Sequence, residues 1–238
     1  MKYLCLCLFV ILFLGVLSSG MNVSATNSIS STETLSEKDA DSFLNNINLS
    51  YLEAPPEKSI IECFDVTNDE MIVLGQKNSD KKVICVYSNN GLFQYGYSFN
   101  CTGKFGVEWN NNNINIYFSR SDVIATIAPK GEIVKLTKFN STTENNSYLN
   151  SKIYSTTRKI GDTKYELKND IGFLNIFASS YSQLTKTLAN GESTVLYDVT
   201  STQLEKTILV FIFVIIMLVA TLGVVIWLLI KFKRLMSD

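Results

Sequence analysis

Several acidic residues lie close together in the sequence, and their carboxylates are the first groups in this chain that could do chemistry. They are Asp65, Asp69, Glu70 and Asp80. A pair of carboxylates can hydrolyse a glycosidic bond when one protonates the leaving oxygen and the other acts as base or nucleophile. Acidic residues at turns are more often only solvated. We therefore assign them no catalytic role and keep a carboxylate-based hydrolase as an alternative function.

Glu108 stands beside Trp109, directly before an asparagine run at residues 110–113. An aromatic face with an acid nearby suits contact with a pyranose ring. The simpler interpretation is that Trp109 ends a strand and packs at its edge. We favour that interpretation and leave the ligand-binding residues undefined.

Three further groups have both a chemical and a structural interpretation. Residues 119–122, Ser-Arg-Ser-Asp, include the rare arginine Arg120 and could bind an anion, but a solvated turn explains them as well. Residues 179–182 are typical of a polar hairpin. Four aromatic residues alternate with period two: Phe93, Tyr95, Tyr97 and Phe99. This spacing favours one face of a strand, and a ligand-binding stripe is the alternative interpretation.

The chain contains no histidine, which excludes Ser-His and Cys-His nucleophiles and histidine-ligated metals. Its formal net charge is −1, so no basic surface indicates nucleic acid as a partner. We predict no catalytic residue, no metal ligand and no cofactor. N-glycosylation sequons occur by chance in a chain rich in asparagine and serine and would matter only in a eukaryotic source; those after residue 25 begin at Asn48, Asn100, Asn140 and Asn145.

Three cysteines follow the N-terminal apolar segment: Cys63, Cys85 and Cys101. An odd number in an oxidising compartment leaves one thiol unpaired or pairs it between chains. We expect small buried apolar side chains. A bridge from Cys63 to Cys85 or to Cys101 stays open.

Residues 208–230 form an uncharged apolar run, which Lys231, Lys233 and Arg234 follow. A helix of this length spans about 35 Å, enough for a bilayer core of about 30 Å. Basic residues mark the cytoplasmic end of such a helix. We predict a juxtamembrane linker at residues 200–207, a transmembrane helix at 208–230 and a cytoplasmic tail at 231–238.

The N-terminus has a second apolar segment, with Lys2 before it and small residues after it. This pattern predicts a secretory signal peptide at residues 1–25, cleaved after Ala25 or after Gly20. An uncleaved anchor is the alternative. In both cases the middle of the chain lies outside the cell.

Residues 26–58 are rich in Ser, Thr, Asn and acidic residues and contain Pro55 and Pro56. This composition predicts a polar, partly disordered tether. A short amphipathic helix is predicted within residues 36–49, since residues 36–39 have the composition of a helix start.

Residues 59–199 are predicted to form an all-β domain of short strands separated by Asn, Asp and Gly turns. They divide into three units of about 40 residues with four antiparallel strands each. The units cover residues 64–99, 105–139 and 165–199, the last with a strand at 173–177, and an insert lies at 140–150. The middle strands of each unit are continuous apolar runs, as expected for strands covered on both faces. Gly91, Gly131 and Gly191 are predicted to supply the positive φ of a two-residue turn in each last hairpin.

Over residues 59–199 these units resemble β-propeller blades of the bacterial surface kind, without a Trp-Asp or Gly-Gly signature. The layout of the whole chain resembles single-pass surface proteins of low-GC Gram-positive bacteria, a resemblance that implies no function. Propellers usually close with at least four blades, and this chain has three units. Strands from upstream sequence, an open sandwich-like stack, or closure with another chain would each resolve the difference. An ordinary β-sandwich is the alternative fold.

The sequence therefore predicts a single-pass cell-membrane protein with an extracellular β-domain and a cytoplasmic C-terminus. Its expected role is that of a non-enzymatic binding or scaffolding module for a partner protein or a surface glycan. A subunit of a larger membrane complex, in contact through residues 208–230, is the other alternative. The predicted partners are the lipid bilayer and a protein or glycan, and not nucleic acid.

Overall fold

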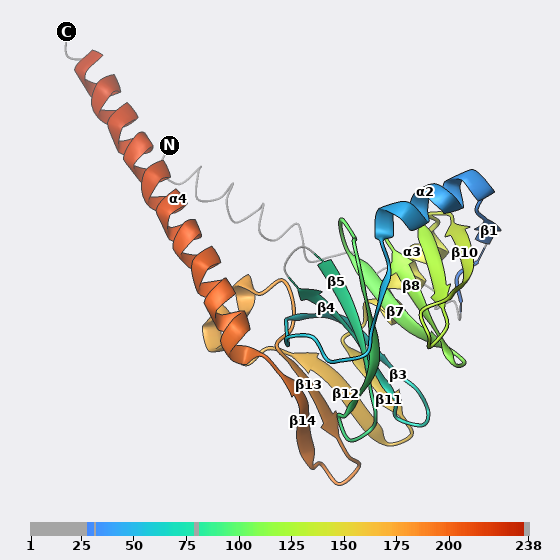
Figure 1. The fold of residues 1–238 in the computed structure, drawn as a ribbon. Helices are drawn as coiled ribbons and strands as arrows, with labels where there is room; N and C mark the ends of the chain where they lie inside the picture. The colour runs from blue at the N-terminus through green and yellow to red at the C-terminus, as the bar shows by residue number, and fades with distance from the viewer. Residues whose placement is uncertain (1–27, 31, 79–80, 236–238) are drawn as a thin grey trace.

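The computed structural model describes residues 28–30, 32–78 and 81–235, with side chains up to residue 230 (Figure 1). Within this part the chain forms three antiparallel β-sheets and one long C-terminal apolar helix. The β-rich fold class is therefore confirmed. The signal peptide predicted at residues 1–25 and the last three residues of the predicted tail lie outside the described residues.

Sheet B forms the middle layer of the domain. Its strands lie in the order β2-β6-β5-β4-β3, with bounds β2 (Ser50–Leu52), β6 (Phe93–Phe99), β5 (Lys81–Tyr87), β4 (Ile72–Asn78) and β3 (Ile61–Val66). Residues 72–74 and 83–86 are buried along their whole length. Both faces of these strands are covered, which is why the runs are continuously apolar, as predicted.

Sheet A packs on one face of sheet B. Its order is β1-β10-β9-β8-β7, with bounds β1 (Thr32–Thr34), β10 (Ile133–Phe139), β9 (Val123–Ile127), β8 (Asn113–Phe118) and β7 (Phe105–Asn110). The core between the two sheets includes Val73, Ile84 and Phe99 from sheet B and Val107 and Ile116 from sheet A. Gly75 leaves room for neighbouring side chains in this core, because an added Cβ would lie 2.4 Å from the Cys63 Sγ and 2.8 Å from the Phe105 ring of sheet A.

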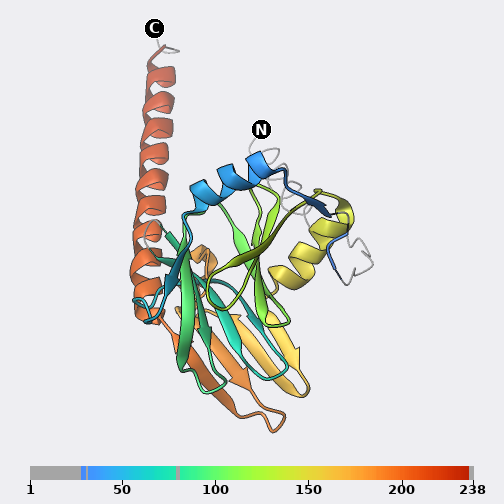
Figure 2. The same cartoon turned by 45° about the vertical axis from the view of Figure 1, so that its right-hand side comes forward.

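Sheet C packs on the other face of sheet B. Its order is β11-β12-β13-β14, with bounds β11 (Thr157–Ile160), β12 (Thr163–Lys168), β13 (Gln183–Thr187) and β14 (Ser193–Asp198). Phe64, Ile72 and Leu74 of sheet B meet Tyr165 and Leu184 in this second core. The three sheets form a stack that does not close into a propeller (Figures 1 and 2).

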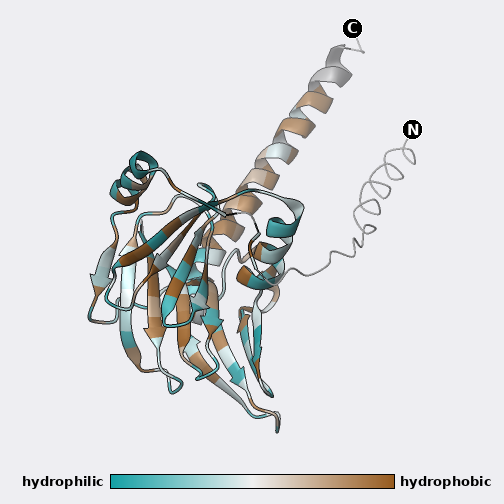
Figure 3. Ribbon diagram, turned by 90° about the vertical axis from the view of Figure 1, so that its right-hand side faces the viewer, coloured by the Kyte–Doolittle hydropathy of each residue, from teal (hydrophilic) through white to brown (hydrophobic). Residues whose placement is uncertain are grey.

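The predicted insert at residues 140–150 forms helical turns, α3 (Thr143–Tyr148) and the π-helical η1 (Leu149–Ile153). Their apolar side chains Tyr148, Leu149 and Ile153 cover the outer face of sheet A. In Figure 3 brown and teal residues alternate along several strands, as expected where one face is covered by another layer and the other is solvated.

The last hairpin of each sheet contains the same turn. The N–H groups of Gly91, Gly131 and Gly191 donate to the carbonyl oxygens three residues earlier at 2.8–2.9 Å. Their φ angles are +79°, +88° and +87°, so the predicted positive φ is confirmed. The predicted loop length was wrong. Each loop has three residues, with the glycine as the left-handed residue that forms a bulge.

The strand predicted at residues 173–177 was also wrong. These residues form a 3-10 helix, η2 (Gly172–Phe177), and β11 supplies the fourth strand of sheet C. Gly172 has a φ of +60°, and the Asn175 side chain accepts a hydrogen bond from the Ile171 N–H. These local interactions favour a turn of helix, which a short apolar run cannot reveal.

The segment predicted as a polar tether contains three elements of the fold. β1 pairs with β10, β2 pairs with β6, and α2 (Glu37–Ile47) lies between them. The helix predicted within residues 36–49 is confirmed, with Ser36 as its N-cap. Ile47 is buried in the core between sheets A and B. Residues 32–52 are thus held by strand pairing and apolar burial, and upstream sequence does contribute strands.

The predicted linker at residues 200–207 is helical. α4 (Thr200–Leu235) runs without a break from the end of sheet C into the apolar run. Its first turns pack on the domain, with Gln203 and Thr207 both 3% exposed. Residues 200–230 have the length and hydropathy of a membrane-spanning helix. In the most apolar part of this helix no residue is buried against the β-domain. A C-terminal helix suited to membrane anchoring is therefore present.

Candidate ligand-binding cleft

Each sheet contains one meander of four consecutive strands: β3–β6 in sheet B, β7–β10 in sheet A and β11–β14 in sheet C. The first strands of these three meanders meet at one place in the domain. β3 lies against β7, and β11 contacts β3. Each of these strands is an edge strand of its own sheet. Side chains from three separate sheets therefore meet where these edges come together.

The carboxylate of Asp65 connects the three edge strands. One oxygen accepts a hydrogen bond from the Trp109 backbone N–H at 2.8 Å, and the other accepts from Arg158 Nε at 2.7 Å. The Asp65 and Arg158 side chains are only 9% and 10% exposed. We call Asp65, Trp109 and Arg158 the Asp65 cluster.

Arg158 makes further contacts that offset the burial of its charge. It donates to the carbonyl oxygens of Phe64, Ser155 and Thr157 at 3.1–3.2 Å, and its guanidinium lies 5.1 Å from the centre of the Phe64 ring. Burying two charges removes their hydration, so such a pair is tolerated only when further hydrogen bonds satisfy it. The Asp65 cluster meets this condition.

Glu108 is the centre of a second polar cluster, beside the first. The hydroxyls of Tyr117 and Tyr148 each donate to its carboxylate at 2.5 Å, and Lys152 Nζ lies 2.9 Å from Oε1. Burial alone would raise the pKa of Glu108, but these three donors together lower it below its ordinary value. Glu108 therefore stays ionised at neutral pH and joins β7 to the helical turns.

A cleft of about 860 Å³ opens beside the Asp65 cluster. Its lining combines two half-buried aromatic side chains, several amides and groups of both charges. The lining residues are Asp65, Val66, Thr67, Asn68, Asp69, Met71, Tyr95, Trp109, Asn111, Asn112, Pro129, Lys152, Arg158, Lys159 and Ile160. They come from all three sheets, so the cleft exists only when the sheets are stacked.

Turns with left-handed residues shape the rim of the cleft. Glu70, after Asp69, has a φ of +61°, and Asn111 has a φ of +54°. The Glu70 carboxylate pairs with Lys186 of sheet C at 2.7 Å, and this hydrogen bond is the main reason that the pKa of Glu70 is lowered. Both side chains are partly exposed, so the pair positions the β3–β4 turn more than it stabilises the fold.

The structure brings together some of the residues singled out in the sequence. Asp65, Asp69, Tyr95 and Trp109 all line the cleft. Glu108 lines a separate, adjoining hollow together with Trp109. Asp80 lies outside the described residues.

Other sequence candidates lie elsewhere. Arg120 and Ser121 line a hollow of about 450 Å³ near α2. Tyr97 and Phe99 are fully buried core residues. Ser180 and Ser182 are buried, and the Ser180 carbonyl accepts from Gln203 of α4, so residues 179–182 connect α4 to the domain.

The three described cysteines are free thiols. Cys63 and Cys85 are buried, and burial raises the pKa of the Cys85 thiol to about 12. They pack as small apolar side chains, as expected. Of the sequon asparagines, Asn145 is fully buried and bonded to Ser30, so glycosylation of the folded chain at this position is excluded.

The sequence interpretation missed Arg158, Lys152 and Tyr148. Arg158 lies 93 residues from Asp65, so spacing along the chain could not pair them. The signal available was its rarity: lysine greatly outnumbers arginine in this chain. The planar guanidinium has five fixed donors, which suit one carboxylate and three backbone carbonyl oxygens together.

Within the described part of the chain, no group of three His, Cys, Asp or Glu side chains could hold a metal ion. No protein-family model matches the chain, and neither a curated protein nor a solved structure shows significant similarity to it. The geometry of the cleft is therefore the basis for a functional proposal.

Proposed function

We propose that this chain is a membrane-anchored, non-enzymatic binding module that holds a saccharide in the cleft beside the Asp65 cluster. The observation that carries the proposal is the composition of this cleft. Tyr95 and Trp109 line it together with Asn68, Asn111 and Asp69. Aromatic faces pack against the C–H surface of a sugar ring, amides donate and accept hydrogen bonds with its hydroxyls, and carboxylates accept hydrogen bonds from them.

A polar ligand suits this cleft better than an apolar one. Several of its side chains are amides or charged groups, and Trp109 Nε1 is buried with no hydrogen-bond partner among the described residues. An unmet donor costs free energy that a ligand oxygen could recover after a small movement of the indole. A partner protein is the second candidate ligand for the same cleft.

The chemistry of the carboxylates favours binding over hydrolysis. Asp65 already accepts two hydrogen bonds, and the lowered pKa of Glu108 opposes its use as a general acid. A hydrolase that uses these two groups would have to break existing contacts first. Release of reducing ends from the bound saccharide would establish the enzyme and overturn the non-enzymatic proposal.

The proposed orientation places the β-domain outside the cell and the C-terminus in the cytoplasm. It is supported by Lys231, Lys233 and Arg234 after the apolar run and by the signal peptide predicted at residues 1–25. Protease added to intact cells should degrade the β-domain and leave a tag after Asp238 protected. The reverse pattern would overturn this orientation.

We also propose that the three meanders are copies of one propeller-like unit in an open stack. The support is the shared glycine turn and a register shift in the last strand pair of each sheet. The shift has the same place relative to the turn in sheets B and A, between Val86 and Tyr87 and between Ile133 and Lys135, and lies two pairs further from the turn in sheet C, between Leu184 and Thr185. If the units are equivalent, exchanging residues 88–92 with residues 128–132 should leave the thermal midpoint unchanged within a few degrees. A collapse of the fold would contradict equivalence.

Tryptophan fluorescence gives a direct test of saccharide binding. The chain has two tryptophans, Trp109 in the cleft and Trp227 in α4. A Trp227→Phe variant therefore reports on Trp109 alone. Titration of the full chain in nanodiscs with neutral and N-acetylated oligosaccharides should shift the Trp109 emission in a saturable way.

Two cleft variants and one matched control identify the binding site. Asp69→Asn keeps the shape of an exposed side chain and removes its charge, and Asn111→Gly keeps the left-handed backbone of a rim residue. Both should weaken saccharide binding about tenfold, or about 1.4 kcal/mol, for one lost hydrogen bond to a charged or amide group. Asn190→Asp, in the exposed turn of the last hairpin of sheet C, should not. Equal binding by all variants would place the ligand elsewhere.

A further inference from the structure

The short helix η2 exposes two large apolar side chains. Phe173 is 73% exposed and Ile176 is 81% exposed, whereas Leu174 between them is buried against the domain. Single exposed apolar residues are common on protein surfaces. Here two lie on one face of a single short element, and we call Phe173 and Ile176 the η2 surface.

The fold holds η2 in this position. The Ile171 N–H donates to the Asn175 side chain at 3.1 Å, and the Asn169 amide donates to the Ser180 carbonyl at 2.9 Å. The same Ser180 carbonyl accepts from Gln203 of α4. η2 and the first turns of α4 are thus connected through one buried residue.

Aromatic contacts with Phe211 show which part of α4 lies beside η2. The ring centres of Phe173 and Phe177 lie 6.1 Å and 5.3 Å from that of Phe211. Phe211 follows the start of the apolar run at Ile208 by three residues, or about 5 Å of helix. Figure 1 shows η2 beside the lower part of α4, where the helix leaves the sheets.

We propose that the η2 surface inserts into the boundary between headgroups and acyl chains, in the leaflet on the domain's side of the membrane. The inference rests on the membrane anchoring that is part of the proposed function. Phe211 belongs to the run that enters the bilayer, and side chains in contact with it lie at the same depth. Apolar side chains at this depth exchange water for lipid, which is the force that holds interfacial helices in place.

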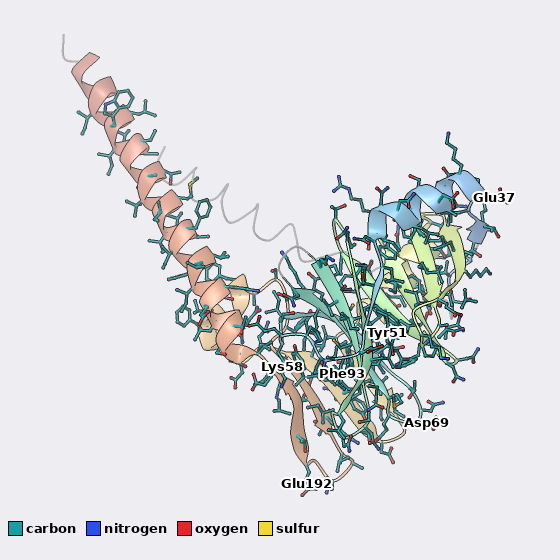
Figure 4. The ribbon with its side chains drawn as sticks, in the orientation of Figure 1. Glu37, Tyr51, Lys58, Asp69, Phe93 and Glu192 are labelled. Carbon is teal, nitrogen blue, oxygen red and sulfur yellow. The ribbon has the colours of Figure 1, made fainter. Side chains whose placement is uncertain are left out.

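A second attachment would restrict how the domain tilts about its anchor. α4 alone leaves rotation about its axis free, whereas α4 and η2 together define a plane. Figure 4 shows Asp69, on the rim of the cleft, on the side of the domain away from α4. With η2 in the lipid, the cleft is held facing away from the point of attachment.

A dye at three positions tests the proposal on the full chain in nanodiscs. The background replaces Cys5, Cys7 and Cys101 by serine, since Cys63 and Cys85 are buried. An environment-sensitive fluorophore is attached in separate variants at Ile176→Cys, Val134→Cys and Leu222→Cys. Val134, in sheet A, is 60% exposed and serves as the aqueous control, and Leu222 reports on the middle of α4.

Lipids that carry a nitroxide at a shallow or a deep acyl position then quench the dye according to depth. We expect the Ile176 dye to emit at shorter wavelength than the Val134 dye and to be quenched at least twofold more by shallow than by deep nitroxide. A Leu222 dye quenched by deep nitroxide confirms the anchor independently. If Leu222 is not quenched, membrane anchoring itself fails.

Two other outcomes would overturn the inference while the anchor stands. An Ile176 dye that matches Val134 in emission and quenching lies in water. An Ile176 dye with short-wavelength emission but no quenching by either nitroxide is covered by protein, as in a complex with a second copy or another chain.

Discussion

Charged side chains are usually exposed and large apolar ones buried, and the Asp65 cluster and the η2 surface each depart from one half of this rule. The cluster buries a carboxylate and a guanidinium, while η2 exposes a phenylalanine and an isoleucine. The buried charges are satisfied by partners within the chain, so they belong to the folded structure. On the η2 surface, Phe173 contacts the Phe211 ring but stays 73% exposed, and Ile176 is 81% exposed. This exposure is the basis for the proposal that the η2 surface meets lipid and not water.

This difference separates what holds the domain together from what we propose η2 does at the membrane. Changes to the Asp65 cluster should alter folding in any solvent. Changes to the η2 surface should alter behaviour only where lipid is present. Four substitutions test this separation, in order of decreasing effect on the stability of the full chain in detergent micelles.

Asp65→Asn should have the largest effect. It leaves the buried Arg158 guanidinium without its anionic partner, which typically costs about 3–5 kcal/mol of unfolding free energy. Urea denaturation followed by circular dichroism measures the loss. Asp69→Asn, at an exposed position on the same cleft, is the matched control and should remain within about 0.5 kcal/mol of the parent chain. Equal stability of the two variants would contradict a structural role for Asp65.

Gly75→Ala should follow, with a loss of about 1–3 kcal/mol from overpacking. The new Cβ would lie 2.4 Å from the Cys63 Sγ and 2.8 Å from the Phe105 ring, both in the core between sheets A and B. Gly223→Ala in α4 is the control, because nothing lies within 4 Å of its added Cβ. Thermal unfolding of both variants should show a lower midpoint for Gly75→Ala alone.

Glu108→Gln should cost about 1–2 kcal/mol at neutral pH, because two tyrosine hydroxyls and Lys152 lose a charged acceptor. The effect should depend on pH. The folded pKa of Glu108 is lower than its ordinary value of 4.5, so the stabilisation is complete above that value and is lost as the pH falls through the folded pKa. Denaturation between pH 7 and pH 3 should show the two chains converge. A constant gap would mean that Glu108 does not titrate in this range.

Ile176→Ser should have the smallest effect on the solubilised chain, within about 0.5 kcal/mol, because the side chain is 81% exposed. Leu174→Ser, its buried neighbour on η2, is the contrasting variant and should destabilise clearly. If Ile176→Ser destabilised the solubilised chain as much as Leu174→Ser, the exposed face of η2 would be part of the core.

Much of the fold follows from local patterns. The apolar run at residues 208–230, the glycine turns and the continuous strands of sheet B were all predictable, because each depends on neighbouring residues and on a fixed period. The polar segment at residues 26–58 was wrongly predicted to be a tether, because its strands do not depend on local patterns. Its strands are three residues long, and only pairing with β10 and β6 defines them.

The sequence by itself determined that a β-rich domain is followed by one helix long and apolar enough for a bilayer, and that histidine chemistry is excluded. Only the tertiary structure decided that Asp65 pairs with Arg158 and that η2 meets Phe211. The physical reason is the separation along the chain over which each kind of interaction acts. Periodicity and turn preference act over a few residues, whereas the stacking of sheets selects contacts between residues far apart in the chain, which no local pattern encodes.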